Sequence, residues 1–112
     1  MSLDEEEQRQ HEIRVKNQEL AEAKGRRVYF EHYRKVHKAI LMKQYESKHP
    51  TAAAQEREAY ADPSYLETLA QLEHWTARAE LLSLERADLE HRFEAWRTRQ
   101  ANQRAERGRY GL

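Results

Sequence analysis

The fold is decided by the stretch from Leu72 to Trp96, which reads LEHWTARAELLSLERADLEHRFEAW. Within it, a mostly apolar series recurs at alternating steps of three and four residues: Leu72, Trp75, Ala79, Leu82, Arg86, Leu89, Phe93 and Trp96. An apolar period of 3.5 residues sustained over more than three heptads is typical of a left-handed coiled coil or a helical hairpin. Arg86 is the one charged residue of the series, and a charge at such a position lowers stability while it fixes register or partner choice.

Proline and its neighbours mark the ends of the expected helices. Proline is poorly tolerated inside a helix and moves the preceding residue out of the helical region, and the two prolines are Pro50 and Pro63. Thr51 is a suitable N-cap for a short Ala-rich helix, and Asp62 followed by Pro63 is a strong start signal for a long one. We therefore expect helices over residues 4–48, 52–61 and 63–107 and a flexible tail at 108–112, in a single helical-hairpin domain over residues 1–112.

The first of these helices carries a weaker apolar series. It consists of Tyr29, Tyr33, Val36 and Ile40, continued toward the N-terminus by Ile13 and Leu20. Since this series also has steps of three and four in its central part, we expect it to face the series around Leu72–Trp96.

Charge order selects an antiparallel arrangement of the two long helices. Counted without histidine, the net charge is −4 for residues 1–23, +6 for 24–49, −6 for 50–96 and +4 for 97–112. A chain folded at residues 50–62 places each basic block beside an acidic one, and the numbers of paired residues then sum to roughly 112. The predicted fold is all-α: a long antiparallel helical hairpin (coiled coil) with a short connecting helix.

Apolar residues off the predicted contact stripe suggest a second contact surface. They are Leu41, Met42, Leu66, Leu69, Leu81 and Leu84. A hairpin of two helices buries a narrow stripe, and small folds need further burial from elsewhere. We therefore expect a homo-oligomer. The number of copies stays open because Arg86 and the aromatic positions fit no simple rule for strand number.

Several functions are excluded by what the sequence lacks. The absence of cysteine excludes a disulfide framework, a thiolate metal site and a cysteine nucleophile. No apolar run approaches the ~18 residues of a membrane span, and the acidic start at residues 4–7 is unlike a signal peptide. We therefore expect a soluble intracellular protein that has no contact with membranes.

Catalytic and metal-binding motifs are also lacking. There is no phosphate-binding loop, nucleophile elbow or HExxH motif, and the serines, Ser64 among them, have no evident histidine partner. Glu46 with His49, and Asp88 with His91, have the i, i+3 spacing of bundle metal sites, but the hairpin keeps the two histidines apart. We expect neither an enzyme nor a bound metal or other cofactor.

Basic residues interleaved with aromatic ones point to nucleic acid. Cationic side chains neutralise phosphates, and aromatic faces stack on unpaired bases. The candidate contact residues are Arg26, Arg27, Phe30, Arg34, Lys35, Lys38, Lys43 and Tyr45 in the first helix and Arg97, Arg99, Arg104, Arg107 and Arg109 in the last. The alternative is that the acidic stretch of the last helix neutralises the basic block at 24–49, since the chain as a whole has no net charge.

Two segments of the second half carry a family resemblance. They are the run from Ala54 to Tyr65, AQEREAYADPSY, and the ending from Phe93 to Arg107, FEAWRTRQANQRAER. Both resemble small helical proteins of bacteriophages and prophages that lie among genes for single-strand annealing proteins, exonucleases and single-strand binding proteins. The resemblance implies a non-enzymatic accessory of phage DNA recombination or replication in the cytoplasm of the host cell, and it assigns no catalytic residue.

Two hypotheses of function follow. The first is an oligomer that binds single-stranded DNA, a recombinase or single-strand binding protein, or both. The alternative is a phage-encoded protein-interaction module without nucleic-acid binding, such as an inhibitor of a host or defence protein or an assembly adaptor. In that case Leu81, Leu84 and the acidic stretch Glu85–Glu94 would face the partner.

Overall fold

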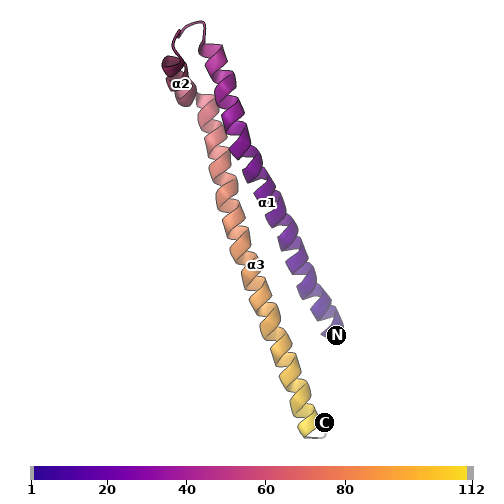
Figure 1. The fold of residues 1–112 in the computed structure, drawn as a ribbon. Coiled ribbons are helices and arrows are strands. Elements are labelled where there is room, and N and C mark those ends of the chain that lie inside the picture. Colours follow the sequence, from indigo (N-terminus) through magenta and orange to yellow (C-terminus); the bar gives the residue numbers. More distant parts are fainter. Residues whose placement is uncertain (1, 111–112) are drawn as a thin grey trace. The chain divides into compact units, whose positions relative to one another are not determined.

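The computed structural model describes residues 2–110, with side chains from residue 4 onward, and confirms the all-α fold class. Helix α1 spans Ser2–Tyr45, α2 spans Ala52–Ala61 and α3 spans Pro63–Arg109 (Figure 1). The chain forms two compact units. The turn unit comprises Ala21–Glu80, and the terminal unit comprises the residues up to Leu20 together with those from Leu81 onward. In each unit a part of α1 runs antiparallel to a part of α3.

The starts of α2 and α3 lie where their caps predict them. The side-chain oxygen of Thr51 accepts a hydrogen bond of 3.2 Å from the backbone N–H of Ala54, which satisfies one of the free donors at the start of α2. Asp62 does the same for α3, because its carboxylate accepts a bond of 2.8 Å from the N–H of Ser64. Pro63 is the first residue of α3, where its missing N–H leaves no helical bond unmade.

The other helix ends differ slightly from the sequence-based expectation. Helix α1 ends at Tyr45 rather than near residue 48, because the next residues form tight turns whose N–H groups bond to the carbonyl oxygens of Lys43 and Tyr45. Helix α3 continues through Gly108 to Arg109. Nothing lies within 4 Å of the position that a Cβ would take at Gly108, so this glycine sits in an open helical turn. Of the expected tail, Tyr110 forms a turn, and residues 111 and 112 lie outside the described part of the chain.

In the turn unit, α2 packs against both long helices and covers an apolar cluster. Leu41 of α1, Ala59 of α2 and Tyr65 of α3 are buried there, and Met42 and Leu69 pack against them. The expectation that Leu41, Met42 and Leu69 lie on an oligomer surface is therefore wrong, because the connecting helix folds back over them. Leu66, Leu81 and Leu84 from the same set are exposed.

The stripe predicted for α3 is confirmed. All eight positions from Leu72 to Trp96 are buried or half-buried, and Leu82 is only 1% exposed. The same alternation of three and four continues to covered residues on both sides, through Thr68 and Tyr65 at the start of α3 and to Gln100 near its end. We call such a run of covered heptad positions a seam.

The seam of α1 is only partly the one predicted. Ile13 and Leu20 are covered as expected and Tyr33 is half-buried, but Tyr29, Val36 and Ile40 are 56%, 56% and 46% exposed. The covered positions, again at steps of three and four, are Glu6, Arg9, Ile13, Lys16, Leu20, Ala23, Arg27, Phe30, Arg34, His37 and Leu41. Charged side chains can occupy such positions because their methylene stems cover apolar surface while their heads reach water.

Contacts between the helices also correct the predicted register. Arg9 lies over the ring of Trp96 in the terminal unit, and His37 bonds to Thr68 in the turn unit. The residue numbers sum to 105 in both pairs, which is one heptad less than the expected value of roughly 112. The earlier end of α1, at Tyr45 rather than near residue 48, accounts for part of this difference.

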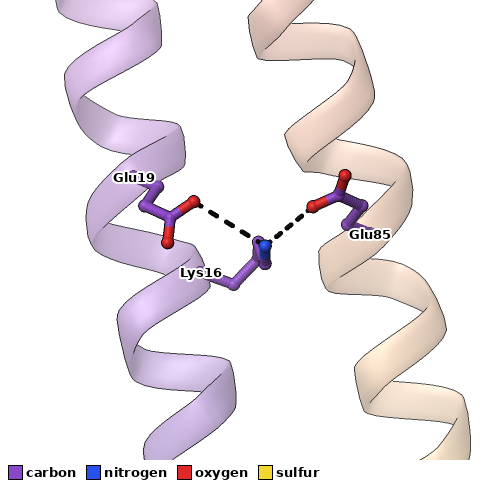
Figure 2. A network of polar contacts seen from close by, with 3 residues as sticks. All are labelled: Lys16, Glu19 and Glu85. Atoms are coloured by element: carbon purple, nitrogen blue, oxygen red, sulfur yellow. Dashed lines mark hydrogen bonds and ion pairs between the residues drawn. The ribbon is translucent and has the colours of Figure 1, made fainter.

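The terminal unit holds a charged pair inside its seam. Figure 2 shows Lys16 of α1 reaching toward Glu85 of α3, with Glu19 on its own helix at the other side. The Nζ atom lies 2.7 Å from the Glu85 carboxylate and 3.7 Å from that of Glu19. The hydrogen bond to Glu85 is the main cause that raises the pKa of Lys16 above its ordinary value. The pair therefore holds the lysine in its charged form between the helices.

Candidate nucleic-acid interface

Two cations of the basic block in the turn unit form ion pairs within the fold. Arg27 lies 3.9 Å from the carboxylate of Glu31. The Nζ of Lys38 lies 3.4 Å from the Glu56 carboxylate and 4.7 Å from the ring centroid of Tyr60. Hydrogen bonding to Tyr60 is the first cause, and the charge of Glu56 a further one, that raises the pKa of Lys38. Glu31 lies on α1 and Glu56 on α2, so neither pair is the expected one with the acidic stretch of the last helix.

The remaining cations of this block differ in exposure. The Arg26 guanidinium carbon lies 5.9 Å from the Trp75 ring centroid, a cation–π distance, although the residue as a whole is exposed. Arg34 belongs to the seam and is half-buried, with its Nε covered. Lys35 and Lys43 are exposed. A phosphate can therefore reach only part of the predicted basic surface in the turn unit.

The two aromatic residues selected as base-stacking candidates are occupied elsewhere. Phe30 is a half-buried seam residue whose ring stands edge-on to Tyr29, with centroids 5.1 Å apart. The hydroxyl of Tyr45 donates a bond of 2.8 Å to the Asp62 carboxylate, and this bond raises the pKa of the tyrosine. Tyr29, which was not selected, is exposed, and its ring stacks on that of Tyr33 at 5.7 Å with an angle of 6° between the planes.

The predicted site residues at the end of α3 are all exposed. Arg97 lies 3.6 Å from the Glu94 carboxylate and 5.7 Å from the Phe93 ring. Arg99, Arg104, Arg107 and Arg109 are exposed, as is every residue from 101 to 110. In the terminal unit this part of α3 extends past the N-terminal end of α1, and among the described residues α1 lies beside its base alone (Figure 1).

Charge is concentrated at this end. Residues 97–110 contain five arginines and one acidic residue, Glu106. A shallow hollow at the base of the extension is lined by residues of both helices, among them Glu6, Trp96, Arg97, Gln100 and Arg104. Among the described residues, Glu6 of the acidic N-terminal block thus meets the basic end of α3 at the base of the extension.

A polar network at the start of α3 is the feature that sequence reasoning missed. The Nδ1 atom of His37 lies 2.9 Å from the Thr68 hydroxyl, and its Nε2 lies 3.2 Å from the Ser64 hydroxyl. The hydroxyl of Ser64 in turn donates to the Asp62 carboxylate at 2.6 Å. The statement that Ser64 has no histidine partner is therefore wrong. The signal that could have found the contact is the register, because a residue-number sum near 105 brings His37 opposite residues 64–68.

The chemistry of this network is that of a helix cap. In a hydrolytic triad the acid orients the histidine and the histidine takes the serine proton, whereas here the serine donates to the acid directly. Bonds from the Ser64 side chain and backbone, and then from Tyr45, lower the pKa of Asp62. The carboxylate thus stays ionised and ties the end of α1 to the start of α3.

Residues 2–110 offer neither a metal-binding cluster nor a helix that could span a membrane. Among residues 2–110 no cluster of three or more histidine, aspartate or glutamate side chains is arranged to hold a metal ion. In the same part of the chain, no helix has both the length and the apolar character needed to cross a bilayer.

Comparison of the chain with protein-family models, with curated proteins and with solved structures gives no match.

Proposed function

We propose that this protein is a non-enzymatic accessory that contacts single-stranded nucleic acid through the arginines at the end of α3. The observation that carries the proposal is the exposure of Arg99, Arg104, Arg107 and Arg109 on a helical extension that the rest of its unit does not cover. The cations of the turn unit contribute less, since Arg27 and Lys38 are paired within the fold.

Electrostatics gives the expected mode of contact. Arginine presents a planar fork that matches phosphate geometry, and each neutralised phosphate releases condensed counterions. Around the extension the arginines point in several directions, since their spacings of two, five, three and two residues do not follow one helical face. Such an arrangement suits a flexible strand that wraps a helix end better than a straight duplex that lies along one side.

The resemblance to phage and prophage proteins supports the biological setting that we propose. In that setting the ligand is the single-stranded DNA of recombination or replication, and a recombinase or single-strand binding protein is a further partner. We propose that the protein acts there as a homo-oligomer, because repeated arginine ends bind one strand with higher avidity than a single end.

Fluorescence anisotropy with a labelled strand of ~30 nucleotides at ~50 and ~200 mM salt tests the proposal. The Arg104→Gln/Arg107→Gln double variant should bind about tenfold more weakly or worse at the lower salt, and its salt slope should fall by about 1.4, since each lost phosphate contact contributes ~0.7. Lys35→Gln/Lys43→Gln is the matched control, which removes two exposed charges from the turn unit. Equal losses in both variants, or wild-type binding that ignores salt, would contradict the proposed surface.

A second candidate function rests on exposed leucines in the terminal unit. Leu81 and Leu84 are 48% and 70% exposed and precede the acidic stretch Glu85–Glu94. An apolar pair beside acidic residues fits a basic protein surface. In this case the purified protein carries no nucleic acid and captures a host protein, and Leu84→Glu abolishes that capture. Loss of capture in Arg104→Gln/Arg107→Gln instead would exclude the leucine surface.

A further inference from the structure

An uncovered stripe runs along α1 in the turn unit. Tyr29, Tyr33, Val36 and Ile40 follow one another at steps of four, three and four, and all but the half-buried Tyr33 are about half exposed. The rings of Tyr29 and Tyr33 stack at 5.7 Å, and that of Tyr33 stacks on His37 at 5.2 Å. The stripe is therefore already ordered. Soluble proteins rarely leave a continuous apolar strip of this kind without a partner.

The surroundings of the stripe are basic or small. Helical spacing places on one face of α1 the residues Gly25, Arg26, Tyr29, His32, Tyr33, Val36, Ala39, Ile40 and Lys43, which we call the α1 face. None of these residues is acidic, and Arg26 and Lys43, both exposed, stand at its two ends. Gly25 and Ala39 let another helix approach closely. The partner that fits is a helix with small residues and acidic side chains.

This chain itself contains such a helix surface in the same unit. The outward side of α3 presents Leu66, Glu67, Ala70, Glu73, Ala77 and Glu80, which we call the α3 face, and all six residues are exposed. Leu66, Ala70, Glu73 and Ala77 repeat the steps of four, three and four found on α1. The α3 face has three acidic side chains and no lysine or arginine.

We propose that the α1 face of one copy packs on the α3 face of a second copy. The two faces match in spacing, in charge and in size, because large Tyr, Val and Ile side chains meet a helix that presents the small residues Ala70 and Ala77. Pairing of like faces is disfavoured, since it would set Arg26 and Lys43 against their own copies, or the three glutamates against theirs. The contact is therefore heterologous, and each copy keeps one free face for the next. This inference concerns the turn unit and does not rest on the proposed arginine surface.

Sedimentation velocity and light scattering from about 1 µM to about 1 mM, the range in which weak contacts dissociate, test the inference. The wild type should increase in mass with concentration beyond a dimer. A variant of each face should stay monomeric by itself: Val36→Asp/Ile40→Asp for the α1 face and Leu66→Asp/Ala70→Asp for the α3 face. Mixed in equal amounts, the two variants should form a dimer that grows no further, because only one intact pair of faces remains.

The mixing step separates the proposal from its alternatives. If the mixed variants stay monomeric while the wild type assembles, the contact joins like faces or lies elsewhere, and the inference is wrong. A wild type that stays monomeric at every concentration also overturns it, whether or not it then binds an oligonucleotide or another protein through Tyr29 and Tyr33. A dimer that stops growing in the mixture supports it.

Charge variants guard against loss of folding. Lys43→Glu and Glu73→Lys each alter one exposed side chain and leave the apolar stripe intact. Each should weaken assembly by itself, and an equal mixture of the two should assemble more strongly than either alone. Unchanged helix content by circular dichroism confirms the fold of every variant. Assembly that is unaffected by both charge reversals would contradict the charge match.

Discussion

The two units of this protein are built on the same antiparallel pairing but differ in what fills it. In the turn unit three helices meet, and Leu41, Ala59 and Tyr65 form a buried cluster. The terminal unit has two helices, and its α1 seam consists of Glu6, Arg9, Ile13, Lys16 and Leu20, of which three are charged. Its apolar residues come mainly from the α3 side, where Leu82 and Trp96 are buried.

This difference teaches where a hairpin of long helices gains its stability. A third helix buries apolar surface on a further side of the two long helices. In a charged seam, by contrast, the methylene stems of the charged residues cover some apolar surface, and the ion pairs add little to the free energy of unfolding. We therefore expect the terminal unit to open locally while the turn unit stays folded, since regions with few buried apolar contacts open at lower free energy. If the terminal unit opens first, the arginines at the end of α3 belong to the unit that opens at lower free energy.

The largest effect is expected from a matched pair of leucine truncations. Leu41 in the turn unit and Leu20 in the terminal unit are 4% and 3% exposed. Leu41→Ala should lower the free energy of unfolding by about 2–5 kcal/mol, the range for buried leucines. Leu20→Ala should lower it by clearly less, because its unit is already open in part of the population. Denaturant unfolding followed by circular dichroism measures both.

A result in which Leu20→Ala is as damaging as Leu41→Ala would break the comparison. It would mean that both units unfold in one step, and that the unit with the charged seam is as stable as the unit with the three-helix cluster. Hydrogen exchange of the wild type gives an independent view, since amides of residues 4–20 should exchange faster than those of residues 30–44.

A smaller effect is expected when the charged seam is made apolar. Lys16→Leu replaces a lysine whose side chain is 21% exposed, and Glu85, with a side chain 39% exposed, can be solvated by water. The change should stabilise the terminal unit by about 1 kcal/mol, as when ion pairs are replaced by packed apolar groups. Amide exchange in residues 4–20 should slow accordingly. Lys35→Leu on the exposed side of α1 is the control and should leave these rates unchanged.

The smallest effect concerns the cap in the turn unit. Because bonds from Ser64 and Tyr45 lower the pKa of Asp62, the folded state binds its proton less readily than the unfolded state does. The carboxylate therefore stabilises the fold above about pH 4, its unfolded pKa, and this contribution is lost as the pH falls through the lower folded pKa. Melting temperatures of the wild type and Asp62→Asn should differ at pH 6 and converge toward pH 2. A difference in melting temperature that grows as the pH falls would contradict the lowered pKa of Asp62.

Much of α3 could be predicted because its sequence and its packing carry the same signal. The steps of three and four from Leu72 to Trp96 fall on apolar residues, and Asp62 with Pro63 marks the start by cap chemistry alone. A helix can be predicted from a single sequence when its local pattern and its packing agree in this way.

Helix α1 was harder because it has two stripes with the same period. The more apolar one, through Tyr29, Val36 and Ile40, faces outward, and the covered one contains Arg27, Arg34 and His37. Hydrophobicity alone therefore selects the wrong stripe. The choice depends on α2, whose packing on Leu41 and Met42 fixes which side of α1 is turned inward.

The candidate site was predictable only as a set of charges. The sequence identifies which residues are basic, but the partners of Arg27 and Lys38 depend on helix phase and on the position of α2. Predicting the contact between His37 and Ser64 requires the correct register of the two helices, and the register inferred from charge order differs from the observed one by a heptad. The exposed arginines at the end of α3 needed no such detail, because no other helix of residues 2–110 covers residues 105–110.

The strict repeat along α1 and α3 leaves their alignment open to slippage. A pattern that recurs every seven residues matches itself after a shift of one heptad. The stripe by itself therefore does not distinguish alignments of the two helices that differ by one heptad. Contacts that do not recur include those at the connection, where Tyr45 bonds to Asp62 and the Gln55 amide bonds to the carbonyl oxygen of His49. Without them the chain would keep its helices and its apolar stripe, yet neighbouring alignments would compete. The contacts of Tyr45, Asp62 and Gln55 thus favour one alignment of α1 with α3 over alignments shifted by a heptad.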